Sequence, residues 1–366
     1  MEKKKYLYID FIRVFSMLSV IILHVVADIM RIDYLRPVWH FSNVISTLCS
    51  SAVPLFFMIS GALLLSNDKS SSIKLLYKER LKKVLIPFLF WSLFTILYLF
   101  IVGLTFYGKI NLTGVEYRLK NLMAKPIMIH FWFMYALIPI YVLLPFIKAF
   151  VDMKNNKLCT YFFVIWLIFS VIFPTLQCFM TDDYKTIVQM DLNYNLNIFN
   201  GYLGFFVLGY YLHNLKFKIK KRWLMLFILL EVTGVSLATY MGTKMTGAYF
   251  ENFKVYSGIF TASLSVALFL LFKELFDDIE TIKGEKILAS ISSASFSVYL
   301  THNILIHFMN INYILVPDGT ILRVIVRVIV VFAVCYILYF ALSKIKPLAF
   351  ITTGNKYKGL KNKCGK

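Results

Sequence analysis

Charged residues are scarce in this sequence. Of its 366 residues only 16% are Asp, Glu, Lys or Arg, whereas 59% are hydrophobic and the mean hydropathy is +0.72. A soluble domain carries about 25% charged residues and needs far less apolar surface. The composition therefore excludes an ordinary soluble enzyme and predicts an integral membrane protein.

Cysteine is also rare, and its spacing indicates no site. The five cysteines form no CxxC pair and fall mostly within or beside apolar stretches, so neither a disulfide framework nor a zinc site is expected. The sequence has no glycine-rich phosphate loop, no HExxH motif and no GxSxG motif. We therefore expect no metal, and any chemistry has to be carried out by the membrane domain itself.

Long apolar stretches recur along the chain. Windows of about 20 apolar residues are long enough to cross the roughly 30 Å hydrocarbon core of a bilayer as helices. The sequence predicts an all-α polytopic membrane helix bundle in one domain, 1–346. The expected spans, about ten in number, are 7–28, 41–66, 84–105, 130–149, 160–179, 198–213, 223–242, 253–273, 290–309 and 321–343.

Positive charge is distributed unevenly between the two sides of the expected bundle. The chain has 39 Lys and Arg against 19 Asp and Glu. The N-terminus and every second connection after it hold 27 of these basic residues, and the other connections hold nine. By the positive-inside rule, this bias places both termini in the cytoplasm and makes 347–366 a basic cytoplasmic tail. The net charge of +20 then indicates contact with membrane lipids, and no nucleic-acid partner is expected.

The stretch "LYIDFIRVFSMLSVIILHVVADIM" (7–30) holds four ionisable residues among apolar ones. Arg13 and His24 are eleven residues apart, which places them about 20° apart around a helix and roughly 16 Å apart along it. Asp10 and Asp28 fall about 60° away on the same side. Because an arginine at membrane depth costs at least about 2.5 kcal/mol, this stripe is expected to face the protein interior or a wet cavity. The alternative is that Arg13 snorkels or pairs with Asp10, and that His24 only joins helices.

Five stretches follow one another in an order typical of a known family. The first is the Arg13-x10-His24 pair of the first span. The others are "VPLFFMISGALLL" (53–65), "AKPIMIHFWFMYALIPIYVLLPFIK" (124–148), "NGYLGFFVLGYYL" (200–212) and "SFSVYLTHNILIHF" (295–308). Together they resemble the acyltransferase-3 family of membrane O-acyltransferases, and within it the ten-span subgroup typified by the enterobacterial common antigen O-acetyltransferase.

The resemblance implies an enzyme of the plasma membrane that transfers an acyl group, most often acetyl, from cytoplasmic acyl-CoA. The acceptor would be a hydroxyl of a cell-surface glycan or of its lipid-linked precursor. His24 would act as general base or carry the acyl group transiently, and Arg13 would anchor the donor or offset developing negative charge. Asp28 would orient the His24 ring, and His302, three residues after Tyr299, would supply a second polar contact or a proton route.

Further residues are candidates for binding. The resemblance places His130 and Trp132 in the cavity wall, although aromatic residues at a membrane interface are also ordinary. Ahead of the third span, Arg80, Lys82 and Lys83 suit the phosphates of acyl-CoA, with anionic lipid headgroups as the equal alternative. Many relatives have Arg-x-x-Arg where this chain has Arg80-x-x-Lys83, which weakens the comparison.

Two arginines in the tenth span are candidates for binding the acceptor. Arg323 and Arg327 lie one helical turn apart, where they would hold an anionic acceptor or a lipid-linked pyrophosphate, or else snorkel to the interface. The rival function for the whole chain is a transporter or exporter of a glycan or an organic anion, because ten spans with buried charges suit a permeation path as well.

Overall fold

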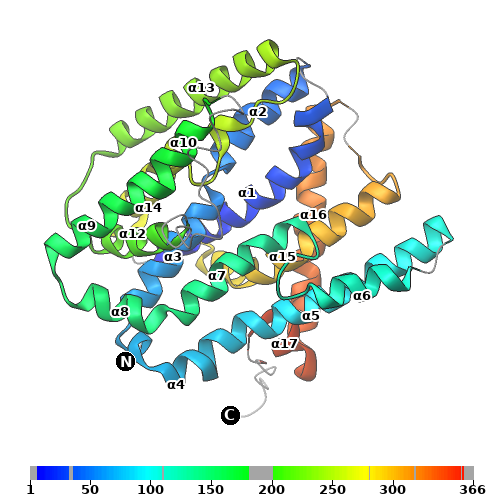
Figure 1. Ribbon diagram of the computed structural model, residues 1–366, viewed down its shortest axis with the longest axis horizontal. Coiled ribbons are helices and arrows are strands. Elements are labelled where there is room, and N and C mark those ends of the chain that lie inside the picture. Colours follow the sequence, from blue (N-terminus) through cyan, green and yellow to red (C-terminus); the bar gives the residue numbers. More distant parts are fainter. Residues whose placement is uncertain are drawn as a thin grey trace.

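The computed structural model describes residues 6–32, 36–108, 111–180, 201–279, 281–316, 319–355 and 357. These residues form helices and contain no β-strand, as the sequence predicted, and the helices assemble into one bundle (Figure 1). The elements, with short 3-10 and π segments labelled η, are α1 Leu7–Ile32, α2 Pro37–Cys49, α3 Ala52–Leu65, η1 Asp68–Ser71, α4 Ile73–Leu75, η2 Leu76–Leu81, α5 Lys82–Tyr107, α6 Leu112–Lys120, η3 Ile129–Phe131, α7 Trp132–Val142, α8 Leu144–Asp152, α9 Asn156–Trp166, η4 Leu167–Ile172, α10 Phe173–Gln177, α12 Leu203–Asn214, α13 Lys221–Thr246, η7 Asn252–Lys254, α14 Ile259–Phe276, α15 Glu285–Ile311, α16 Ile321–Ser343 and α17 Lys346–Thr353.

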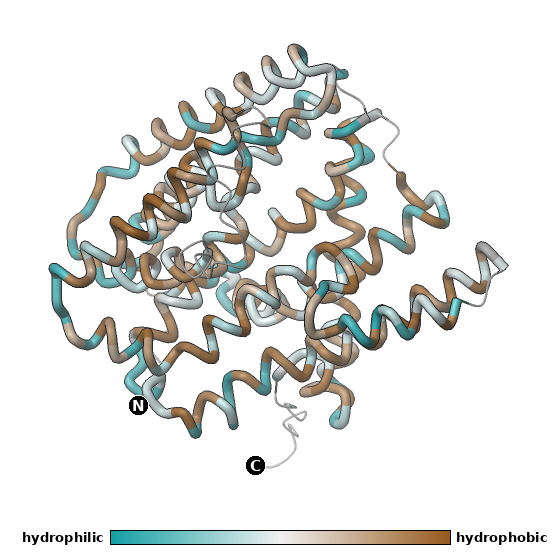
Figure 2. The backbone as a smooth tube through the Cα atoms, in the orientation of Figure 1, coloured by the Kyte–Doolittle hydropathy of each residue, from teal (hydrophilic) through white to brown (hydrophobic). Residues whose placement is uncertain are grey.

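Seven helical segments of the described residues are long and apolar enough to cross a membrane, or eight if α7 and α8, which meet at 56°, form one broken span. Hydrophobic residues dominate these helices, and hydrophilic residues gather in the connecting segments (Figure 2). A polytopic membrane protein is therefore confirmed, whereas the count of ten spans is not. The cytoplasmic location of both termini stays a prediction.

Two helices account for most of the difference in the count. The α12 helix has 12 residues and rises roughly 18 Å, which is shorter than the hydrocarbon core. The expected span 198–213 also begins outside the described residues. The α15 helix has 27 residues, but Ser, Thr, Asn and His side chains lower its hydropathy. Such a helix is suited to the interior of a bundle, where polar side chains find partners.

Helix α1 passes through the middle of the bundle and packs against α2, α3, α14, α15 and α16 (Figure 1). Small side chains permit this packing. Ser16 and Ser19 of α1 are fully buried, and α15 contributes a run of small residues that includes the buried Ser292 and Ser295. Lipid tails are as apolar as Leu, so the hydrophobic effect does not drive membrane helices together. They associate instead through close van der Waals packing, which small residues permit. The polar face of α1 is thereby directed at α15.

Helices α3 and α12 approach each other so closely that two glycines have no room for a side chain. A Cβ atom on Gly61 would lie 1.6 Å from the carbonyl oxygen of Phe206, and one on Gly209 would lie 1.9 Å from the carbonyl oxygen of Met58. This reciprocal contact fixes two of the stretches that carry the family resemblance against each other, beside the central helix.

Candidate active site

Helices α1 and α15 bring two of the predicted site residues into contact. The ring centroids of His24 and His302 are 5.1 Å apart. His302 is completely buried, whereas His24 is partly exposed. The face that Arg13 and His24 share on α1 therefore points into the protein, as the helical spacing predicted, and not into lipid.

A third histidine joins this pair from η3. The His130 ring lies 5.0 Å from the His302 ring and 6.3 Å from the His24 ring. Its Nε2–H donates to the carbonyl oxygen of Leu300 at 3.4 Å, and its Nδ1 accepts from the Asn303 side chain at 3.3 Å. The Tyr299 hydroxyl donates to the backbone carbonyl of His130. We call His24, His130 and His302 the histidine cluster; within it, His130 is held at both ring nitrogens.

The hydrogen bonds of His302 fix which of its ring nitrogens carries the proton. Nδ1 lies 2.7 Å from the carbonyl oxygen of Tyr299, and because a carbonyl can only accept, Nδ1 carries the hydrogen. Nε2 is buried and has no hydrogen-bond partner among the described residues. A neutral ring in this tautomer has its free lone pair on Nε2, which makes it a proton acceptor within the cluster.

Arg13 is neutralised locally on the same face of α1. Its guanidinium donates to the Ser292 hydroxyl at 2.8 Å and to the Asp10 carboxylate at 3.3 Å. The Ser292 hydroxyl in turn donates to the same Asp10 oxygen at 2.6 Å. The pairing with Asp10, which was the alternative interpretation of Arg13, is therefore present, but Arg13 also has a second partner on α15 and lines a hollow.

The hollow at Arg13 has a volume of about 290 Å³ and is lined by residues of α1, α3, α5, α7 and α15 and of the segment that follows α16. We call it the Arg13 cavity. Its polar lining includes Ser60, Lys83, Tyr141 and Tyr299. Its apolar lining consists mainly of phenylalanine and leucine side chains, a combination typical of small-molecule sites.

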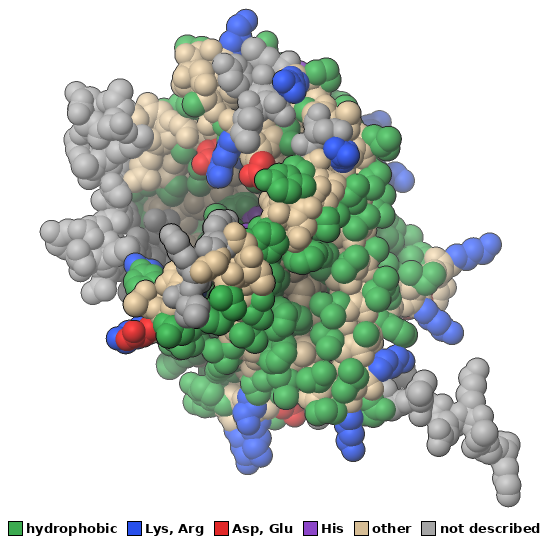
Figure 3. Space-filling model, turned by 90° about the vertical axis from the view of Figure 1, so that its right-hand side faces the viewer, with side chains coloured by type: hydrophobic (Ala, Val, Ile, Leu, Met, Phe, Trp, Pro, Cys, Tyr) green, Lys and Arg blue, Asp and Glu red, His purple; other side chains and the backbone are tan. Residues whose placement is uncertain are grey.

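A second hollow, of about 360 Å³, lies farther along α1 and is lined by His24, Arg31, Glu251, Lys254 and Tyr256, among others. We call it the His24 pocket. Acidic and basic side chains also stand at the rim of a hollow on the face shown in Figure 3, with a histidine visible inside it.

Arg13 and His24 thus line separate hollows, with a row of side chains between them. Tyr299 lines the Arg13 cavity, and its ring centroid lies 6.0 Å from that of His302. His302 in turn contacts His24, which lines the other hollow. Tyr299 and the buried His302 therefore connect the linings of the two hollows.

Of the basic residues Arg80, Lys82 and Lys83, only one lies at the cavity. Lys82 and Lys83 are both exposed at the start of α5, and of the two only Lys83 lines the cavity. The Arg80 guanidinium donates to the Ser70 hydroxyl at 2.5 Å, which joins η2 to η1. The structure therefore brings one of the three predicted donor-binding cations to the hollow that contains Arg13.

Asp28 and the arginines of α16 lie apart from both hollows. Asp28 is exposed and makes no hydrogen bond to His24 among the described residues, so the expected contact that orients the ring is not seen. Asp28 instead interacts electrostatically with Arg327, which is buried and donates to the Asn310 side chain. Arg323, one turn earlier, is half-buried. Neither arginine is among the residues that line the two hollows.

Lys254 is a site residue that the sequence analysis missed. Its ammonium donates to the Asn43 side chain at 2.6 Å, to the Asn43 carbonyl at 3.0 Å and to the Ser46 hydroxyl at 2.9 Å. These bonds tie the segment between α13 and α14 to α2 and place a cation in the wall of the His24 pocket. The available signal was its position inside the expected span 253–273, because ionisable residues in spans are functional candidates.

Trp132 reaches the His24 pocket only through a neighbour. Its ring stacks on Tyr256, with centroids 5.6 Å apart and planes at 25°, and Tyr256 lines the pocket. Trp132 also contacts the Tyr202 ring at 5.4 Å. It therefore supports the pocket wall, which is less than the lining role expected for it.

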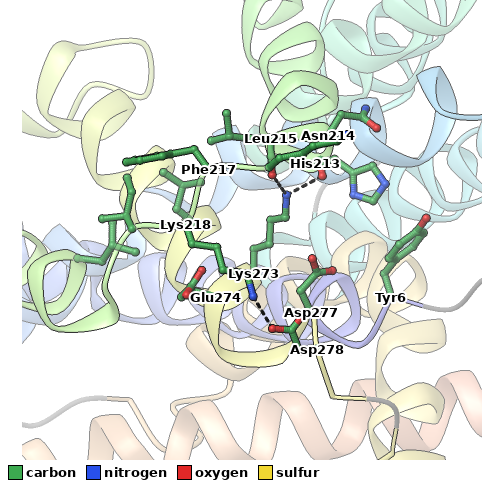
Figure 4. A pocket seen from close by; sticks show the side chains of 14 residues that line it. Tyr6, His213, Asn214, Leu215, Phe217, Lys218, Lys273, Glu274, Asp277 and Asp278 are labelled. Atoms are coloured by element: carbon green, nitrogen blue, oxygen red, sulfur yellow. Dashed lines mark hydrogen bonds and ion pairs between the residues drawn. The ribbon is translucent and has the colours of Figure 1, made fainter.

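Figure 4 shows a further pocket, whose lining includes no member of the histidine cluster. It is lined by residues around the end of α12 and the end of α14, with a volume of about 400 Å³. Lys273 donates to the carbonyl oxygens of His213 and Leu215 at 2.6 and 2.8 Å, and Lys218 pairs with Asp278 at 2.5 Å. Lys273 caps the C-terminus of α12, so its charge is already used by the fold.

The chain matches the model of a protein family. The family model described as "Acyltransferase domain" covers residues 6–340, which is nearly the whole chain and includes every member of the histidine cluster. No curated protein and no solved structure matches significantly, and the resemblance to the enterobacterial common antigen subgroup stays a prediction. The extent of the family match, on an all-α bundle with apolar helices, shows that this protein is a membrane acyltransferase of the acyltransferase-3 family.

Proposed function

We propose that this acyltransferase is acyl-CoA-dependent and acylates a hydroxyl of a cell-surface glycan or of its lipid-linked precursor in the plasma membrane. Acetyl is the proposed acyl group. The observation that supports this best is the position of His24, which lines a hollow while its ring touches a second histidine. An acceptor hydroxyl in the His24 pocket would meet a base there.

The proposed step is the attack of the acceptor hydroxyl on the thioester. His24 takes the hydroxyl proton as the oxygen bonds to the thioester carbonyl carbon. The carbon–sulfur bond then breaks, and the thiolate takes the proton back from the histidinium, so that free thiol and O-acyl ester leave. His302, with its Nε2 lone pair in the cluster, would stabilise the protonated His24 ring.

Arg13 suits a role in anchoring the donor better than a role at the reacting carbonyl. It lies roughly 16 Å from His24 along the helix, too far to stabilise charge that develops beside the His24 ring. Arg13 and Lys83 both line the Arg13 cavity, so an anionic or polar part of the donor would find two basic side chains there, with the charge of Arg13 partly offset by Asp10. The donor would extend past Tyr299 towards His24.

A transfer assay with matched histidine variants tests this function. Purified protein in vesicles would receive radiolabelled acetyl-CoA and host membranes that contain lipid-linked saccharides. We expect label in the saccharide fraction, and a loss of at least about 100-fold in rate for His24→Ala because general-base catalysis contributes that much. His40→Ala is the control, because His40 is exposed on α2 and is not among the residues that line the two hollows.

Two results would count against the proposal. Full activity in His24→Ala protein would remove the catalytic role of this ring. Movement of unmodified saccharide across the vesicle membrane, without label transfer, would support the transporter alternative. Acid quenching during turnover distinguishes the two catalytic routes, because an acyl-histidine intermediate leaves label on the wild-type protein and direct transfer does not.

A further inference from the structure

The Arg13 cavity has a wall that lies outside the family domain. The family match ends at residue 340, within α16. The cavity is nevertheless lined by Thr353, Gly354 and Asn355, which follow at the end of α17. A segment that the sequence analysis assigned to a basic tail therefore forms part of the hollow that contains Arg13.

Helix α17 is held firmly in this position. It packs against α5 and α16, and the Trp91 indole N–H donates to the carbonyl oxygen of Thr352 at 2.9 Å. Thr352 and Thr353 are only 0% and 3% exposed. A buried indole bonded to a specific carbonyl is a strong positional restraint, so the turn that follows α17 has a defined place at the cavity.

Gly354 forms this turn and lies against the backbone of Lys83. Its backbone is left-handed, with φ +71°, and its N–H closes the helix on the carbonyl of Phe350 at 2.9 Å. A Cβ atom there would lie 2.2 Å from the carbonyl oxygen of Lys83, which itself lines the cavity. Only glycine combines this backbone with this close approach.

Asn355 contributes an exposed side chain to the lining of the cavity. Its backbone N–H donates to the Thr353 hydroxyl at 3.1 Å, whereas the one hydrogen bond of its side chain within the described part of the chain is a long one of 3.5 Å, to the Tyr339 hydroxyl. The side chain is exposed, so it has both donors and an acceptor to offer. A secondary amide on a ligand is the natural complement of a primary amide of this kind.

We propose that the turn 353–355 is a donor-binding element that holds the pantetheine arm of the acyl donor, with Asn355 bonded to one of the arm's amides. This rests on the proposed function. A hollow of about 290 Å³ lies at the lower limit of ligand pockets and accommodates the arm, not a whole nucleotide. The same arm occurs in acyl-CoA and on acyl carrier proteins, and both are donor sources for the test.

The test compares Asn355→Ala and Gly354→Ala with Gly247→Ala. Gly247 has the same left-handed position at the end of α13, with φ +69°, but nothing lies near its added Cβ. Loss of one hydrogen bond predicts a rise of about three- to tenfold in the KM for acetyl-CoA in Asn355→Ala protein. The kcat and the acceptor KM should stay unchanged, and Gly247→Ala should leave the donor KM at the wild-type value.

Acetyl-pantetheine and an acetylated carrier protein complete the experiment. The Asn355→Ala effect should persist with acetyl-pantetheine, and the wild-type rate shows which of the two large donors is used. Unchanged donor KM in Asn355→Ala protein, or loss of the effect with acetyl-pantetheine, would overturn this inference alone, since wild-type transfer would still occur. Absence of transfer from every donor in the wild type would overturn the proposed function with it. Asn355 is exposed, so this readout does not depend on whether Gly354→Ala folds.

Discussion

At the scale of single residues, the two buried histidines next to His24 differ in the hydrogen bonds that their ring nitrogens make. His130 is hydrogen-bonded at both ring nitrogens, whereas the Nε2 atom of His302 has no partner in the part of the chain that the structure describes. A histidine with both nitrogens occupied serves mainly to position its neighbours. His302 is suited to take part in proton movement through His24.

The substitution His302→Asn separates a structural role of His302 from a role in proton movement. An asparagine amide replaces the Nδ1–H that donates to Tyr299, but it has no counterpart of the Nε2 lone pair. We expect His302→Asn to lower kcat by at least about 100-fold with an unchanged melting temperature, and to shift the pH profile of kcat. His130→Asn should lose less activity and keep the wild-type profile. Wild-type activity in His302→Asn protein would reduce His302 to a structural hydrogen bond.

At the scale of elements, the contact between α3 and α12 determines how the bundle closes around α1. Alanine in a helix normally stabilises it by about 1 kcal/mol relative to glycine. At Gly209 the added Cβ meets the Met58 carbonyl oxygen at 1.9 Å, so overpacking should outweigh that gain and cost about 1–3 kcal/mol. Thermal unfolding in detergent should show a lower midpoint for Gly209→Ala.

Gly234 provides the matched control for this contact. It lies within α13, is exposed, and has open space where the methyl group of an alanine would lie, so Gly234→Ala should keep or raise the midpoint. A Gly209→Ala protein as stable as wild type would mean that α3 and α12 separate easily, and that their close approach does not hold the bundle together.

At the scale of the whole molecule, hydropathy and helical spacing predicted the bundle and the inward position of Arg13 and His24, because both depend on the local pattern of residues. Asp28, which was expected on the same inward stripe, is exposed. Hydropathy and helical spacing did not place Lys254 in the His24 pocket or α17 in the Arg13 cavity. Those contacts join segments hundreds of residues apart in the sequence, and nothing local to Lys254 indicates that α2 supplies its partners. The electrostatic interaction of Asp28 with Arg327 likewise joins residues that are far apart in the sequence.

The two hollows also predict how the substrates reach the protein. The Arg13 cavity and the exposed Lys82 lie towards the beginning of α1, and the His24 pocket with the exposed Glu251 lies towards its end. Acetyl-CoA is too polar to cross a bilayer, so vesicles should use it from one side only. Lys82→Cys and Glu251→Cys, labelled with a membrane-impermeant maleimide, report which end of the protein faces outward. We expect the consumption of external acetyl-CoA to rise with the fraction of Lys82→Cys molecules that the external maleimide labels. If consumption instead rises with the labelled fraction of Glu251→Cys molecules, the donor enters through the His24 pocket, and the assignment of the two hollows is reversed.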